Sequence, residues 1–232
     1  MRVALCLSGQ ARSVEQTYWS SIKPNILDLG NVDVFIHTWA LDESQIGNRF
    51  LAAGVHPVGE PLEANLIEKT LTLYNPVKSF VEPQREFPVI PQEPRHMPGF
   101  RSELVYSMFY SIYQSNLLKV QYEQEMGITY DWVIRSRFDI TTPSGPLPLG
   151  TLDSSNLYIP TGGFDTINGY LDSLAYSNSH NMNTYSDTFS YLDTILNIPD
   201  IRLCGEYVLR HHLDTNSNRI NVQEIGTHKL LR

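Results

Sequence analysis

Short apolar runs alternate with amphipathic segments along most of the chain. Residues 2–7 and 31–39 are apolar runs of strand length, and residues 14–29 between them have helical spacing, although Pro24 interrupts the middle of the predicted helix. A strand, a helix and a second strand in succession predict a βαβ unit and favour a parallel sheet. The apolar side of the helical segment is made by Trp19, Ile22, Ile26 and Leu29.

The middle of the chain contains the strongest helical pattern. Residues 102–125 keep apolar and tyrosine side chains at helical spacing, and Gly127 follows as a typical helix end. Before it, residues 83–98 hold five prolines and predict a loop. The weaker patterns predict a helix over 63–74, strands over 76–81, 130–134, 156–159, 170–177 and 219–222, and helices over 181–196 and 204–213.

This order of elements favours a mostly parallel α/β sheet with the later strands added at one edge. In open sheets of this kind, ligands bind beyond the carboxyl ends of the strands. The polar residues that follow each predicted strand are therefore the first candidates for function.

Composition narrows the classes of partner. The formal net charge is −8, from 17 basic and 25 acidic residues, so we expect no nucleic-acid partner. No apolar run approaches the ~20 residues of a membrane-spanning helix, so no integral membrane segment is expected. The two cysteines, Cys6 and Cys204, are expected to be buried reduced thiols in a cytoplasmic protein.

Two of the predicted strand ends combine glycine, serine and aromatic residues. Ser8, Gly9, Gln10 and Arg12 follow the first strand, where a glycine lets the backbone approach a ligand and an arginine can meet a phosphate. The alternative for this segment is a simple turn into the helix. His37 and Trp39 end the second strand and can either contact a ligand or seal the core.

The strand over 130–134 leads directly into charged residues. Because side chains alternate along a strand, Arg135, Arg137 and Asp139 are expected to point the same way. Charges at such a place need partners. Internal ion pairing is one solution, and a phosphate-bearing ligand bound by the guanidinium groups is the other, with Asp139 on a divalent cation or a sugar hydroxyl.

Three further residues are candidates in the last third of the chain. Asp172 has apolar neighbours and is expected to be partly desolvated, as a general base would be. Glu206 opens a predicted helix, and His228 lies near the C-terminus. The plain alternative for any one of them is a solvated surface group.

Several of these segments together resemble a group of small glycosyltransferase-like proteins of bacteria and large viruses. The resemblance covers nearly the whole chain, is weakest over residues 42–98, and depends on the order and spacing of its motifs. The matching segments are residues 7–12 (LSGQAR), 33–39 (DVFIHTW), 131–140 (DWVIRSRFDI), 170–177 (YLDSLAYS) and 205–213 (GEYVLRHHL).

The resemblance implies a GT-A-like, Rossmann-like single domain over residues 1–232, with a nucleotide-binding half over roughly 1–140 and an acceptor half over roughly 141–232. It implies a nucleotide-sugar donor, and a glycan or polysaccharide as acceptor. Such enzymes usually hold Mn²⁺ or Mg²⁺ with an Asp-x-Asp motif, of which only Asp139 is present here. We expect either a divalent cation held by Asp139 and His228, or neutralisation of the leaving diphosphate by Arg135 and Arg137 without a metal.

The resemblance also implies roles for the candidate residues. Asp172 is expected to be the catalytic base, with Glu206 as the second choice. A non-catalytic nucleotide- or carbohydrate-binding module is the alternative function, and the absence of a phosphate-binding loop speaks against a phosphotransferase. The residues expected to bind the donor are Ser8, Gly9, Gln10, Arg12, His37, Trp39, Arg101, Arg135, Arg137 and Asp139.

Overall fold

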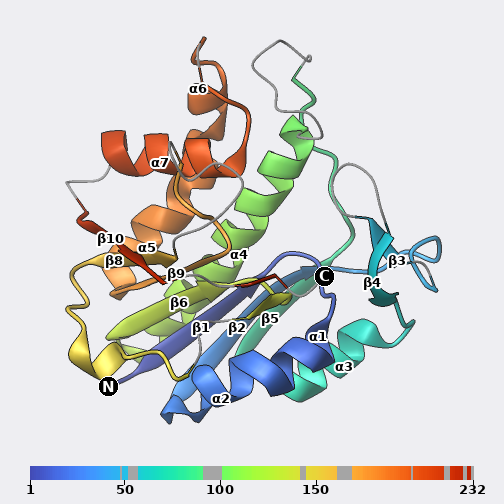
Figure 1. Ribbon diagram of the computed structural model, residues 1–232, viewed down its shortest axis with the longest axis horizontal. Coiled ribbons are helices and arrows are strands. Elements are labelled where there is room, and N and C mark those ends of the chain that lie inside the picture. The colour runs from blue at the N-terminus through green and yellow to red at the C-terminus, as the bar shows by residue number, and fades with distance from the viewer. Residues whose placement is uncertain are drawn as a thin grey trace.

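A central sheet of seven strands, counted within the described residues, runs through the molecule (Figure 1). The computed structural model describes residues 1–47, 49–51, 57–90, 101–141, 145–160, 169–199, 201–216, 220–226 and 229–230. In spatial order the strands are β10 (Val222–Ile225), β8 (Leu157–Pro160), β9 (Leu174–Ser177), β6 (Trp132–Ser136), β1 (Val3–Ser8), β2 (Val32–Trp39) and β5 (Lys78–Glu82).

The four strands β5, β2, β1 and β6 form a parallel block, which confirms the βαβ prediction. All six residues of β1 are buried, as expected for a parallel strand covered on both faces. β9 pairs antiparallel with both β6 and β8, and β10 returns parallel to β8. The later strands are thus added at one edge, and the expected class, a mostly parallel α/β sheet flanked by helices, is confirmed.

Helices cover both faces of the sheet (Figure 1). On one face α1 (Val14–Thr17), α2 (Lys23–Asn25) and α3 (Leu66–Tyr74) enclose a core around Leu5, Ile36 and Ile134. On the other face a second core lies around Cys6, Phe35 and Phe109. It is covered by α4 (Ser102–Met126), α5 (Ser179–Ser186), α6 (Leu192–Leu196) and α7 (Gly205–Asn216).

The segment over residues 14–29 is not the single α-helix that its spacing predicts. A π-helical stretch, Tyr18–Ile22, separates α1 from α2, and a 3₁₀ turn, Leu27–Leu29, follows. Pro24 has no backbone N–H to donate, and it lies in α2 directly after the π-helical stretch. Because the wider turn shifts the faces of the helix, Trp19 is 57% exposed instead of joining the apolar side.

Other differences are confined to short elements. The hairpin of β3 (Arg49–Leu51) and β4 (Pro57–Pro61) and the pair of β7 (Ile140–Thr141) and β11 (Lys229–Leu230) are not predicted by the sequence pattern. Only the second half of residues 170–177 forms a strand. A 3₁₀ helix, Asp187–Tyr191, divides the expected helix over 181–196 between α5 and α6.

The order of the sheet fixes where a ligand can meet it. The connections from β1 to β2 and from β2 to β5 pass over the face of α1 to α3, and the connection from β5 to β6 passes through α4 on the other face. The crossovers therefore change face between the neighbouring strands β1 and β6. Ligands of open α/β sheets bind at such a point, beyond the carboxyl ends of the strands.

Candidate functional site

Two arginines, from the segments that follow the neighbouring strands β1 and β6, meet on one carboxylate at this point. Arg12 Nε lies 2.6 Å from Asp139 Oδ2, and Arg137 donates through Nε to Oδ1 at 2.8 Å and through Nη2 to Oδ2 at 2.9 Å. The side chain of Asp139 is 2% exposed, against 16% for Arg12 and 23% for Arg137. The three side chains form a largely buried cluster with a formal charge of +1.

Phe138, between Arg137 and Asp139 in the segment after β6, is anchored in the core. Phe138 is 1% exposed, and its carbonyl accepts a hydrogen bond from the buried Thr17 hydroxyl at 2.5 Å. Burial opposes ionisation of Asp139, but Arg137 and Arg12 outweigh it and hold the pKa of this carboxyl below its ordinary value. Asp139 is therefore an anion throughout the neutral range and is bonded to both guanidinium groups.

Arg135 does not join this cluster by any hydrogen bond that the structure shows. It lies within β6, where it is 2% exposed, and its Nη1 donates to the main-chain carbonyl of Asp172. The strand ends at Ser136, and Arg137 and Asp139 both act on the charge of Arg135, so the expectation that these three side chains point the same way stays a prediction. Burial lowers the pKa of Arg135, and its Nε has no hydrogen-bond partner among the described atoms.

The two candidate acids, Asp172 and Glu206, lie on segments that pack closely together. Each segment has a glycine against the acid of the other. A Cβ added at Gly205 would collide with the Asp172 carboxylate, and a Cβ added at Gly169 would lie 2.6 Å from Glu206 Cβ. The Tyr170 N–H donates to the Glu206 carbonyl at 3.0 Å. The glycines therefore permit a close approach that brings Asp172 and Glu206 to the same wall of the site.

Arg137 connects this wall to the cation cluster. Burial lowers the pKa of Arg137, but Asp139 outweighs it, and Asp172 and Glu206 act on the same guanidinium in the same direction. Asp172 is 8% exposed, and its carbonyl also accepts a hydrogen bond from the Tyr185 hydroxyl at 3.3 Å. The site thus has cations at the ends of β1 and β6 and acids before β9 and at the start of α7.

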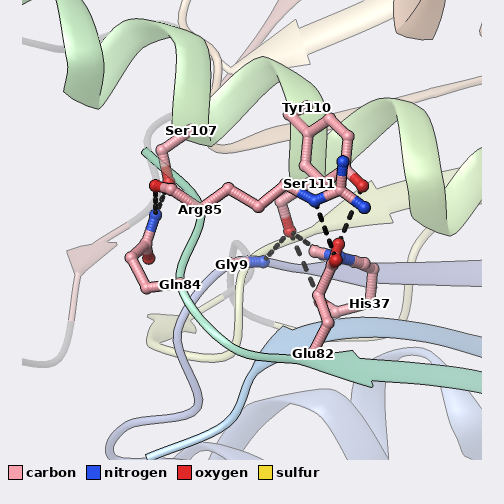
Figure 2. Close-up of polar contacts among 8 residues, drawn as sticks. All are labelled: Gly9, His37, Glu82, Gln84, Arg85, Ser107, Tyr110 and Ser111. Carbon is pink, nitrogen blue, oxygen red and sulfur yellow. Dashed lines mark hydrogen bonds and ion pairs between the residues drawn. The ribbon is translucent and has the colours of Figure 1, made fainter. Parts of the chain in front are cut away.

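His37 and Trp39 face α4 and do not line an open surface. His37 is fully buried, and its ring nitrogens lie 2.7 Å from Ser111 Oγ and 3.1 Å from Glu82 Oε1 (Figure 2). Trp39 is 5% exposed and stacks on Tyr110 with the ring centroids 5.7 Å apart. Of the two alternatives for this pair, the structure favours packing over direct contact with a donor.

The remaining expected donor residues lie at or after the end of β1, or just before α4. Ser8 is 2% exposed, and its hydroxyl has no partner among the described atoms. Gly9 has a φ of 102° and donates its N–H to Ser111 Oγ at 2.7 Å, and Gln10 is half-buried. The side chain of Arg101 is 61% exposed, and its guanidinium lies 3.4 Å from Glu103 in the first turn of α4.

The donor set described at Asp139 does not fit a divalent cation. Both carboxylate oxygens already accept bonds from guanidinium groups, and a divalent cation there would stand beside two positive charges. No group of three or more His, Cys, Asp or Glu side chains suited to a metal occurs in the described part of the chain. His228 lies outside the described residues, so we assign no step to a metal.

Sequence reasoning did not single out Glu82, Arg85 or Ser111, which complete the network around His37. Glu82 Oε1 accepts from the Tyr110 hydroxyl at 2.8 Å, and Oε2 accepts from Arg85 Nε at 2.8 Å. The only signal for Ser111 is a small polar residue on the buried side of a long helix, and such a residue does not reveal its partner. The signal for Glu82 is an acid that ends an apolar strand.

No protein-family model matches the chain, and no curated protein matches it. Solved structures with a similar arrangement include a glycosyltransferase involved in the glycosylation of the major capsid of PBCV-1, at 7% identity and a TM-score of 0.39 over 98% of this chain and 81% of that chain. Another is a nucleoside-diphosphate-sugar pyrophosphorylase from Vibrio cholerae, at 10% identity and a TM-score of 0.44 over 99% of this chain and 95% of that chain. Similarity at this level assigns neither a reaction nor a residue's role.

Within the described residues, no helix is long and apolar enough to cross a membrane.

Proposed function

We propose that this protein is a glycosyltransferase that moves a sugar from a nucleotide-sugar donor to a hydroxyl group of a glycan or polysaccharide acceptor. The observation that carries the proposal is the separation of charge around Arg137. This guanidinium shares Asp139 with Arg12, and it is acted on by Asp172 and Glu206 from another part of the chain. Sugar transfer needs cations for the leaving diphosphate and an acid–base group for the acceptor.

The cation cluster supplies the first requirement. Arg12 and Arg137 stand beyond the ends of β1 and β6, at the position where α/β sheets bind ligands. A guanidinium has five N–H donors in a fixed fork, so one side chain can bind both a carboxylate and a phosphate. We assign the diphosphate of the donor to these two arginines. Arg135, placed beneath, supports the Asp172 main chain.

Asp172 supplies the second requirement. In the proposed reaction, the bond between the anomeric carbon and the diphosphate oxygen breaks, and the acceptor oxygen forms a bond to that carbon. The electron pair of the broken bond leaves with the diphosphate, whose added charge is countered by Arg12 and Arg137. The acceptor hydroxyl gives its proton to the carboxylate of Asp172, and Glu206 is the second candidate for this role.

The test is release of nucleoside diphosphate from a panel of nucleotide sugars with added oligosaccharides. We expect Asp172→Asn to lower turnover about a hundredfold to ten-thousandfold while the thermal shift caused by the nucleoside diphosphate remains. The control is Asp28→Asn, because Asp28 is an acid that is 53% exposed and pairs with Lys23 on the surface. Its turnover should equal that of the wild type.

Two results would contradict the proposal. If no nucleoside diphosphate stabilises the wild-type protein at millimolar concentration, the diphosphate assignment is wrong. If the wild-type protein binds nucleotide sugars but releases no diphosphate with any acceptor, the alternative of a non-catalytic nucleotide- or carbohydrate-binding module replaces the transferase.

A further inference from the structure

The first residue beyond β1 is held by a side chain of α4. The Gly9 N–H donates to Ser111 Oγ at 2.7 Å, across 102 positions of the sequence (Figure 2). Gly9 has a φ of 102°, a conformation that side-chain-bearing residues rarely adopt. A flexible residue at this point gives the chain many directions in which to leave the strand. The bond to Ser111 selects one of them.

The orientation of the Ser111 hydroxyl depends on His37. Since Ser111 Oγ accepts from Gly9, its own proton must go to another acceptor, and His37 Nδ1 lies 2.7 Å away. The His37 carbonyl, at 3.4 Å, is a longer alternative. Donation to Nδ1 requires that this nitrogen carry no proton, which places the proton of the neutral ring on Nε2.

Glu82 fixes this tautomer. His37 Nε2 lies 3.1 Å from Glu82 Oε1, and a carboxylate can only accept at neutral pH. Burial raises the pKa of Glu82, but bonds from Tyr110, Arg85 and His37 outweigh it and keep the pKa below its ordinary value. Burial lowers the pKa of His37, so the ring is neutral. The bonds therefore run in one direction, from Gly9 through Ser111 and His37 to Glu82.

The members of this chain are too deeply buried to touch a ligand. Ser111 and His37 are fully buried, and Glu82 is 9% exposed. Three residues after Gly9 the same segment places Arg12 on Asp139. Among the described residues, the hydrogen bond to the Gly9 peptide links these three side chains to the segment that carries Arg12. A buried polar chain in which each donor has one acceptor holds a single geometry.

We propose that Ser111, His37 and Glu82 are positioning residues for the anion site, because they fix the Gly9 peptide and so the placement of Arg12 beside Arg137. The inference rests on the proposed function, since it concerns the same anion site. It assigns to His37 an indirect role in place of the donor contact expected from the sequence. It also gives Ser111, whose hydroxyl contacts only Gly9 and His37 among the described residues, a measurable effect on anion affinity.

The test compares two serines of α4 that are equally buried. Ser111→Ala removes the acceptor of the Gly9 N–H. Ser115→Ala removes a hydroxyl that, within the part of the chain the structure describes, donates to the Ile112 carbonyl of its own helix at 3.0 Å. We expect Ser111→Ala to weaken binding of inorganic pyrophosphate about tenfold, the equivalent of one hydrogen bond, and Ser115→Ala to leave it unchanged. Hydrogen exchange of the Gly9 amide should be faster in Ser111→Ala alone.

The tautomer of the His37 ring can be measured on the wild-type protein, so this test does not depend on the folding of a variant. The ring ¹⁵N shifts of His37 should report a neutral ring protonated on Nε2, and a proton on Nδ1 would overturn the proposal. Equal pyrophosphate affinity in the two serine variants would overturn it while leaving the proposed function intact. If the wild-type protein binds no pyrophosphate, the proposed function fails first and this inference fails with it.

Discussion

Arg12 and Asp139 are 127 residues apart in the chain, and the Arg12 Nε lies 2.6 Å from the Asp139 carboxylate. This bond joins the segment after β1 to the segment after β6, where the crossovers of the sheet change face. A second arginine, Arg137, shares the same carboxylate. One acid therefore organises two cations at the place where α/β sheets bind their ligands.

Removal of either arginine should weaken anion binding. We expect Arg12→Ala and Arg137→Ala each to lower the affinity for inorganic pyrophosphate about tenfold to a hundredfold, the range for a hydrogen bond to a charged group. The control is Arg210→Ala, because Arg210 is 42% exposed and pairs with Asp214 one turn along α7. Isothermal titration calorimetry measures all three, and a loss as large in Arg210→Ala as in the others would show that only net charge matters.

Asp139→Asn should destabilise the fold. The substitution leaves two largely buried guanidinium groups without their carboxylate, and breaking a buried ion pair from one side costs about 3 kcal/mol or more. Urea unfolding at neutral pH measures the free energy of unfolding. The control is Asp28→Asn, because Asp28 is 53% exposed and its pair with Lys23 lies on the surface. A change below that of Asp28→Asn would contradict the central place of Asp139 in the cluster.

Asp139 should also set part of the acid sensitivity of the protein. Its pKa is lower in the folded state than the ordinary value of 3.8, because Arg137 and Arg12 outweigh the effect of burial. The unfolded state therefore binds the proton more readily, and stability falls as the pH decreases. The contribution is complete above the ordinary pKa and is lost as the pH falls through the folded-state pKa. Urea unfolding from pH 6 to pH 3 should show a shallower decline in Asp139→Asn than in the wild type, and an identical decline would contradict the assignment.

Binding of a nucleoside diphosphate should not require a divalent cation. Both oxygens of Asp139 are bonded to guanidinium groups, so the charge that a metal would supply comes from Arg12 and Arg137. We expect equal affinity in EDTA and in Mg²⁺ or Mn²⁺, measured by thermal shift at several nucleotide concentrations. Binding that occurs only with a metal would restore the expectation of a cation held by Asp139 and His228.

Gly205→Ala should disturb the acid-bearing wall. An added Cβ would collide with the Asp172 carboxylate and with the Met108 side chain, so one of them must move. We expect turnover to fall while pyrophosphate affinity stays near that of the wild type, because Arg12 and Arg137 lie on other segments. Gly150→Ala is the control, since a Cβ there meets no atom. Unchanged turnover in Gly205→Ala would contradict the role given to Asp172.

Much of the fold could be predicted from the sequence, because apolar residues repeat with the spacing of a strand in some segments and of a helix in others. The apolar run that becomes β1 and the long helix α4 lie where the pattern places them. The π-helical stretch Tyr18–Ile22 could not be predicted, because one widened turn does not change the apolar spacing enough to be read from the sequence. The antiparallel direction of β9 is likewise a property of the assembled sheet and not of its residues.

The candidate site could be predicted only in part. The charged residues that follow β6 can be recognised because they come directly after an apolar strand. The structure brings Arg137 and Asp139 together with Arg12. Their partners depend on three-dimensional packing, so the sequence did not show that Arg135 bonds to the Asp172 carbonyl and not to Asp139. Ser111 had none either, because a small polar residue on a buried helix face is compatible with many partners.

The most direct test of the central claim is a crystal structure of the protein soaked with a nucleoside diphosphate. The account predicts phosphate oxygens within hydrogen-bond distance of both Arg12 and Arg137, beyond the ends of β1 and β6, with the Asp172 carboxylate on the side of the acceptor. A diphosphate bound elsewhere, with the two arginines contacting only Asp139, would contradict it.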